Sequence, residues 1–171
     1  MVAQNDDASL ESRPPTVDDL ANLCRRLNEA GAKYIVIGGM AVIQSGFVRT
    51  TEDIDLLVDT SQENQNKIRS AMMYLSDQAI RDIQPEDLDT YQVLRIADEF
   101  IVDLMKSAGG VGYDEAKDDV TTVSIDGVPI PFASPQLLFK LKNTLREKDK
   151  LDYLFLKELL QNELALPQPL S

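Results

Sequence analysis

The chain has 171 residues, of which 43% are hydrophobic and 27% are charged, and its formal net charge is −12. This size and composition fit one globular domain that needs neither disulfides nor a structural metal to form its core. The sequence contains no apolar run of the ~18 to 20 residues that cross a bilayer and no secretion signal at its amino end, which predicts a cytoplasmic protein without membrane spans.

Two residue types limit the chemistry that is open to the chain. It has no histidine, which excludes Ser/His/Asp and Cys/His catalysis and zinc sites built on imidazole. Cys24 is the only cysteine and lies on an apolar helix face, so we expect a buried structural thiol. The acidic balance argues against broad electrostatic binding to nucleic acid. Any chemistry must therefore use carboxylates, lysine, arginine and metal.

The first third of the chain predicts a tail, a helix, a strand and a short second helix. Residues 1–15 have few large apolar side chains and are expected to form a loose tail. From residue 17 to 30 apolar residues recur at spacings of three and four, with Thr16 as N-cap and Gly31 as stop. Residues 34–37 form a continuous apolar run that is typical of a strand buried on both faces, and a helix is expected over 40–45.

The middle of the chain predicts a second buried strand over 53–59 and a helix over 62–75. Two further strands are expected over 91–96 and 100–105, joined by a turn at Asp98-Glu99. Residues 109–112 are rich in glycine and predict a flexible loop.

The carboxyl-terminal part predicts a hairpin followed by two helices. Residues 121–125 and 128–132 flank Asp126-Gly127, a pair that suits a type I′ turn. Ser134-Pro135 opens the first helix, and the second runs over 148–162, before a tail over 165–171. The expected fold is α/β with a mixed twisted sheet, in one domain over 16–164 that comprises an α/β core (16–133) and a C-terminal helical pair (134–164).

Three carboxylates on the predicted strands indicate a metal site. Asp53 and Asp55 point to the same face of their strand, which forms an open clamp of hard oxygen ligands that suits magnesium. Asp103 interrupts an apolar strand, and a buried carboxylate needs a partner or a metal. If the two strands are neighbours, the three acids could hold two metals, and Asp103 could accept a proton from an acceptor hydroxyl.

A pair of glycines is the second candidate feature. Gly38-Gly39 lies between a buried strand and the start of a helix, where the missing side chains let backbone amides approach a phosphate closely. A lone glycine pair is a weak signal. A strand, the glycines, a helix and then Arg-Thr-Thr-Glu-Asp-Ile-Asp over 49–55 form a stronger one, because each part suits the same ligand.

The segments Ile37-Gly38-Gly39-Met40-Ala41 and Gly46-Phe47-Val48-Arg49-Thr50-Thr51-Glu52-Asp53-Ile54-Asp55-Leu56 resemble the signature of the polymerase-β-type nucleotidyltransferase superfamily. The subgroup they resemble most is that of the small bacterial nucleotidyltransferases of abortive-infection and toxin–antitoxin (AbiEii) type. Leu138-Phe139-Lys140 and residues 146–152 resemble the Lys and Arg/Lys-Asp segments of its helical half. Many members carry a serine at the position of Gly39, so one hydroxyl contact to phosphate is lost here.

The resemblance implies a nucleotidyltransferase fold with a two-metal site for Mg²⁺, or alternatively Mn²⁺. It implies that Asp53, Asp55 and Asp103 are the catalytic, metal-binding residues, and that nucleotide contacts come from Gly38, Gly39, Arg49, Thr51 and Lys140. The implied activity is transfer of a nucleotide from a nucleoside triphosphate such as ATP to tRNA, a protein or a small molecule, with release of pyrophosphate. The acidity of the chain slightly favours a cationic small acceptor over tRNA.

Several alternatives stay open from the sequence. The chain could be a non-catalytic module that binds a nucleoside triphosphate in a toxin–antitoxin-like pair, with a cognate partner protein or as a homodimer. Asp103 could instead form a structural salt bridge with Arg49 or Arg95. Lys140 and Lys142 could simply be the solvated side of an amphipathic helix.

Overall fold

A mixed sheet forms the centre of the molecule, for which a computed structural model describes residues 12–142 and 147–165. The strands of this sheet are β1 (Tyr34–Ile37), β2 (Asp53–Val58), β3 (Val93–Ala97), β4 (Ile101–Met105), β7 (Val120–Ile125) and β8 (Val128–Ala133). Their order is β3-β4-β2-β1-β8-β7. The pairs β2–β4 and β1–β8 are parallel and the other three pairs are antiparallel, so the α/β class with a mixed sheet is confirmed.

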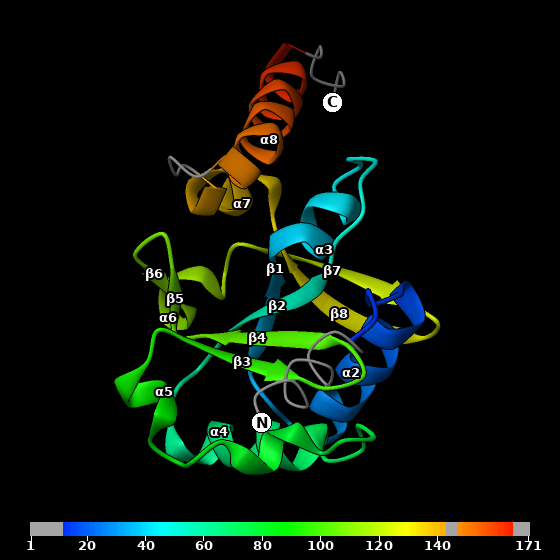
Figure 1. Ribbon diagram of the computed structural model, residues 1–171. Helices are drawn as coiled ribbons and strands as arrows, with labels where there is room; N and C mark the ends of the chain where they lie inside the picture. The colour runs from blue at the N-terminus through cyan, green and yellow to red at the C-terminus, as the bar shows by residue number, and fades with distance from the viewer. Residues whose placement is uncertain (1–11, 143–146, 166–171) are drawn as a thin grey trace.

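The helices lie on both sides of this sheet (Figure 1). They are α2 (Val17–Glu29), α3 (Gly38–Gln44), α4 (Gln62–Met72), α5 (Asp87–Thr90), α6 (Tyr113–Ala116), α7 (Pro135–Lys142) and α8 (Glu147–Ala165), with a 3₁₀ turn η1 at Ala79–Asp82. Helices α2 and α4 pack together on one side, whereas α3 and the pair α7–α8 lie on the other. Among the described helices, none is both long enough and apolar enough to cross a membrane.

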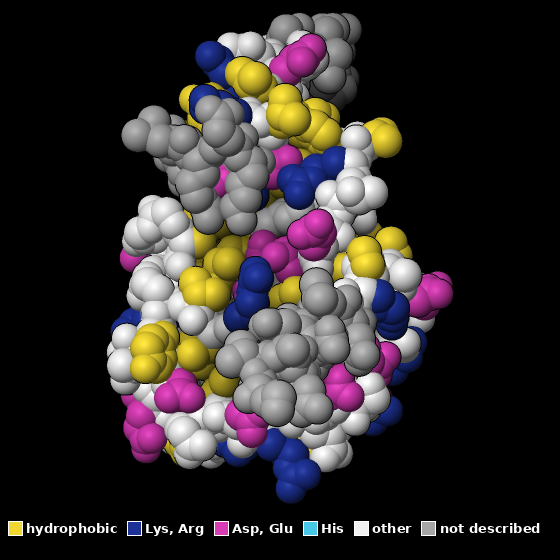
Figure 2. Space-filling view, viewed as in Figure 1, with side chains coloured by type: hydrophobic (Ala, Val, Ile, Leu, Met, Phe, Trp, Pro, Cys, Tyr) yellow, Lys and Arg dark blue, Asp and Glu magenta, His cyan; other side chains and the backbone are white. Residues whose placement is uncertain are grey.

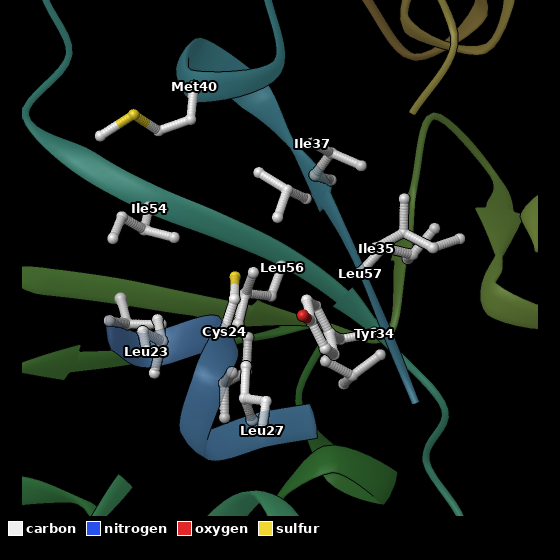
Figure 3. Packing of buried hydrophobic residues seen from close by; sticks show 14 of the residues in the cluster. Leu23, Cys24, Leu27, Tyr34, Ile35, Ile37, Met40, Ile54, Leu56 and Leu57 are labelled. Carbon is white, nitrogen blue, oxygen red and sulfur yellow. The ribbon is translucent and has the colours of Figure 1, made fainter. Parts of the chain in front are cut away.

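Helix α2 supplies much of the core. The Thr16 hydroxyl accepts a hydrogen bond from the Asp19 amide, and the Asp19 carboxylate accepts one from the Thr16 amide, which forms a capping box at the predicted N-cap. The buried face of α2 turns Cys24 and its neighbours toward Tyr34 and Leu56 of the sheet (Figure 3). Burial raises the pKa of the Cys24 thiol to about 12, so the thiol is a core group, as the sequence predicted.

In the described part of the chain, hairpins connect three pairs of neighbouring strands. In the β7–β8 turn Asp126 and Gly127 have φ values of +52° and +77°, as the predicted type I′ turn requires. The loop predicted over 109–112 is shorter than expected, because Gly109 and Gly110 form a turn whereas β6 (Val111–Gly112) pairs with β5 (Ser107–Ala108). In the β3–β4 hairpin Ala97 pairs with Ile101.

The two predicted tails lie mostly outside the described residues, which begin at 12 and end at 165. The described part of the first tail contacts the β3–β4 turn. The Arg13 amide donates a hydrogen bond to the Glu99 carbonyl at 2.9 Å, and the Ser12 hydroxyl donates one to the Asp98 carbonyl at 2.7 Å. Residues 12–15 are therefore joined to the domain, which the composition of this segment did not predict.

Candidate functional site

The register of three strands brings the predicted carboxylates together. Strand β2 lies between β1 and β4, and Asp55 is the direct neighbour of Asp103 on β4 and of Ile37 on β1. Side chains alternate along a strand, so Asp53 lies on the same face as Asp55. One carboxylate oxygen from each aspartate lies within 4.8 Å of the others. Asp103 is only 4% exposed, whereas Asp53 and Asp55 are partly buried.

The predicted glycines pack directly against this cluster. Gly38 has a φ of +66°, and a Cβ at this position would lie 2.8 Å from the carboxylate carbon of Asp55. A Cβ at Gly39 would lie 2.5 Å from the Thr51 hydroxyl. Because real Cβ atoms do not approach other atoms so closely, only glycine lets the chain pass here at this distance from the carboxylates.

Arg95 of β3 reaches over the carboxylates from the edge of the sheet. It is the register neighbour of Asp103, to which its Nε and Nη2 donate hydrogen bonds at 3.0 and 2.9 Å. Its Nη2 also lies 3.3 Å from an oxygen of Asp53. These hydrogen bonds to Asp103 raise the pKa of the Arg95 guanidinium above its usual value, so Arg95 stays charged.

The helical pair contributes a second, buried group of charges. Lys142 at the end of α7 lies 3.1 Å from Asp149 and 3.2 Å from Asp152, both on α8. The guanidinium of Arg49, in the segment that precedes β2, donates hydrogen bonds to both oxygens of Asp152. Each of the two aspartates is 1% exposed, so these ion pairs join α7, α8 and the chain before β2 within the protein.

These two groups of charges face each other across one pocket. Its lining includes five aspartates and the three cations Arg49, Arg95 and Lys142, with Gly39 and Thr51 at one side and the apolar Val93 and Met105 at another. Figure 2 shows acidic and basic side chains gathered on this face of the molecule, between the helical pair and the edge of the sheet. The pocket thus combines a carboxylate cluster with fixed cations.

The structure brings most of the predicted site residues to this pocket. The residues that line it are Asp53, Asp55, Asp103, Gly39, Arg49 and Thr51, and Gly38 packs against Asp55. Thr51 is buried and its hydroxyl donates to the Asp53 carbonyl at 3.1 Å, which supports the start of β2. Lys140 is the exception, since it is exposed and does not line the pocket, whereas Lys142 does.

Four further charged residues line this pocket that the sequence did not place in the site, although each carries a signal. From the sequence, Arg95 is expected only as a structural partner of Asp103, and Lys142 only as a surface residue. Asp149 and Asp152 stand three residues apart in an otherwise leucine-rich helix, a spacing that places two acids on one helix face. Arg146, in the same motif-like segment, lies outside the described residues.

The donor set of the cluster fits a hard divalent cation. Three carboxylates offer only oxygen ligands, and the two partly buried acids leave room for water and for oxygens of a ligand. Magnesium or manganese suits such a site better than a soft metal that prefers sulfur or imidazole.

A family model described as "Nucleotidyl transferase of unknown function (DUF2204)" matches residues 16–164. Among solved structures, the chain resembles that of "a putative nucleotidyltransferase" from Thermotoga maritima, with 17% identity, a TM-score of 0.46, and coverage of 85% of this chain and 87% of the other. No protein with a curated function matches the sequence.

Proposed function

This chain belongs to the DUF2204 family of nucleotidyl transferases, and we propose that it transfers a nucleoside monophosphate from a nucleoside triphosphate to an acceptor in a reaction that depends on a divalent metal and releases pyrophosphate. The observation that carries the proposal is the convergence of Asp53, Asp55 and Asp103 within 4.8 Å. These aspartates would hold Mg²⁺ or Mn²⁺. The metal would supply charge stabilisation to the triphosphate and to the attacking oxygen.

The residues around the cluster would divide the remaining tasks. The backbone at Gly39 borders the pocket without a side chain, which gives a triphosphate close access to the cluster. Arg49 and Lys142 are the cations on the helical side of the pocket, which is formed by α7, α8 and the segment before β2. They would neutralise the leaving pyrophosphate. Asp103, adjacent to Asp55, would accept the proton of an acceptor hydroxyl.

The charges of the pocket and of the whole chain bear on the choice of acceptor. The pocket lining carries both signs of charge, so electrostatics alone supports tRNA, a protein or a small molecule to similar degrees. The net charge of −12 slightly favours a cationic small molecule over tRNA. A cognate partner protein and a homodimer belong to the same proposal, as properties of the toxin–antitoxin-type proteins that the sequence resembles.

The test is transfer of label from each α-³²P-labelled nucleoside triphosphate to total RNA, protein and small-molecule fractions, with and without Mg²⁺. Asp53→Asn keeps the shape of the side chain and removes a metal ligand, so transfer should fall about a thousandfold or more. Asp114→Asn is the matched control, because Asp114 is highly exposed and lies outside the pocket, and it should act as wild type does. A triphosphate that binds in calorimetry but labels no fraction would contradict the proposal and favour a non-catalytic binding module.

A further inference from the structure

The guanidinium of Arg95 binds two of the three carboxylates of the candidate metal site. It contacts both oxygens of Asp103, at 3.0 and 2.9 Å, and one oxygen of Asp53, at 3.3 Å. Two of the three carboxylates that could bind a metal are therefore already paired with one protein cation. Both oxygens of Asp103 accept hydrogen bonds from Arg95, so a divalent ion bound to Asp103 would have to use an oxygen that already contacts a cation.

We propose that Arg95 competes with the divalent metal for Asp103 and Asp53, and that the guanidinium must leave these oxygens before the metal is fully coordinated. This inference rests on the proposed metal-dependent function. Two cations cannot share the same pair of carboxylates at contact distance without strong mutual repulsion. Arg95 is then a positioning residue that lowers the affinity of the free site for metal.

The burial of the two partners shows which of them can move. The Arg95 side chain is 58% exposed and stands on β3, the edge strand of the sheet, so its guanidinium can regain water contacts when it swings away. The carboxylate of Asp103 is almost completely buried within β4 and cannot follow. The exchange therefore replaces one cation by another at a fixed acid.

The exchange also explains why a buried acid is stable before metal arrives. A carboxylate that is buried without a partner is strongly unfavourable, and Asp103 has the bidentate arginine in that state. Arg95 thus supplies the hydrogen bonds that the buried Asp103 carboxylate needs, and the consequence is weaker metal binding. Removal of Arg95 should destabilise the metal-free protein and strengthen metal binding at the same time.

Direct Mn²⁺ binding by calorimetry and electron paramagnetic resonance tests the proposal on the full-length chain without substrate. Arg95→Gln should lower the dissociation constant for Mn²⁺ at least about tenfold, because the metal no longer displaces a cation. Arg95→Lys should lower it about threefold, since one ammonium cannot engage both Asp103 oxygens as a guanidinium does. Arg49→Gln is the matched control: it removes a cation of the same pocket whose partner is Asp152, and it should stay within about twofold of wild type.

Thermal unfolding adds an independent readout. Arg95→Gln should have a lower Tm than wild type in metal-free buffer and a larger rise in Tm on addition of Mn²⁺. If Arg95→Gln does not unfold cooperatively, Arg95→Lys, which keeps the charge, should show the same lower Tm in metal-free buffer and the same larger rise in Tm with Mn²⁺, to a smaller extent.

The outcomes separate this inference from the proposed function. Equal or weaker Mn²⁺ binding by both Arg95 variants than by wild type would overturn the competition and leave the metal-dependent function intact. An equal increase in Mn²⁺ affinity in Arg49→Gln and Arg95→Gln would also overturn the competition, because the loss of one positive charge from the pocket would then explain both results. Folded wild type and folded Arg95 variants that all fail to bind Mn²⁺, both alone and with a triphosphate, would overturn the metal-dependent function itself.

Discussion

The sheet side of the pocket, with Asp53, Asp55 and Asp103, and the helical side, with its buried ion pairs, are held in place by different interactions. On the sheet side, Asp55 and Asp103 are fixed by strand register, and the residues that alternate with them, such as Ile54 and Val102, are completely buried. On the helical side, the buried side chains among those described in α8 are Asp149, Asp152 and Leu156, two of which are acids. Figure 1 shows α8 directed away from the sheet, so little of its length packs against the core.

This difference indicates how each side responds to change. Carboxylates that are fixed by a hydrogen-bonded ladder and an apolar core keep their geometry when a nearby charge is altered. Cations that are fixed by ion pairs depend on both partners, because loss of one leaves the other buried without compensation. We therefore expect substitutions on the sheet side to alter the chemical step, and substitutions on the helical side to alter stability and triphosphate binding together.

Among substitutions that leave the carboxylates themselves intact, the largest effect on activity is expected from Gly38→Ala on the sheet side. The new methyl group would overlap the Asp55 carboxylate and displace it from its neighbours. A displacement of about 1 Å at a catalytic group can reduce a rate about 100-fold, so kcat should fall by about this factor. Nucleotide transfer measured at saturating triphosphate checks the result.

Gly127→Ala is the matched control for this substitution. Gly127 also has a positive φ, of +77°, but it lies in the β7–β8 turn with open space around the position of a Cβ. Gly127→Ala should lose about 1 kcal/mol of unfolding free energy from backbone strain, measured by urea titration. Gly38→Ala should lose more, because its methyl group also overlaps Asp55, and only Gly38→Ala should lose activity. Equal kcat values in the two variants would mean that the position of Asp55 does not matter for catalysis.

A smaller effect on activity, with a larger one on stability, is expected from Asp152→Asn on the helical side. The substitution leaves Arg49 and Lys142 without their shared carboxylate. The unfolding free energy should fall by about 2 to 3 kcal/mol, and KM for the triphosphate should rise about tenfold as both cations shift. Glu158→Gln, on an exposed position of the same helix, should change neither quantity.

A double-mutant cycle tests whether the ion pair itself is responsible. If Arg49 and Asp152 stabilise the protein through each other, the losses in Arg49→Gln and Asp152→Asn should not add. A coupling free energy of about 1 to 3 kcal/mol is expected from urea unfolding of the two single variants and the double variant. A coupling near zero would show that Asp152 stabilises the protein through Lys142 or through packing and not through Arg49.

Local sequence signals predicted most of the fold but not the contacts between distant segments. Helix α2 with its Thr16 cap, the turn at Asp126 and the position of the glycines all follow from residues close together in the chain. The parallel pairing of β2 with β4 is different, because it joins residues almost 50 positions apart and no local pattern encodes it. The convergence of Asp55 and Asp103 was accordingly only a conditional expectation.

The contact between Arg95 and Asp103 depends on a one-residue difference in the register of the β3–β4 hairpin. A turn confined to Asp98 and Glu99, as the sequence suggested, would pair Arg95 with Val102. The structure places Phe100 in the turn as well, where the Asp98 amide donates to its carbonyl, and Arg95 then pairs with Asp103. Because the buried Phe100 favours this arrangement through packing, the local turn signal was not sufficient.

The smallest effect separates two lysines that the sequence could not distinguish. Lys140 and Lys142 lie two residues apart on α7 and therefore face nearly opposite sides of the helix; Lys142 lines the pocket, and Lys140 is exposed. Lys142→Gln should raise KM for the triphosphate about fivefold, whereas Lys140→Gln should stay within about twofold of wild type. Steady-state kinetics on the two variants decides the assignment. A rise in KM for Lys140→Gln alone would show that Lys140 reaches the triphosphate, as the family resemblance implied, and that Lys142 serves only the buried ion pairs of the helical side.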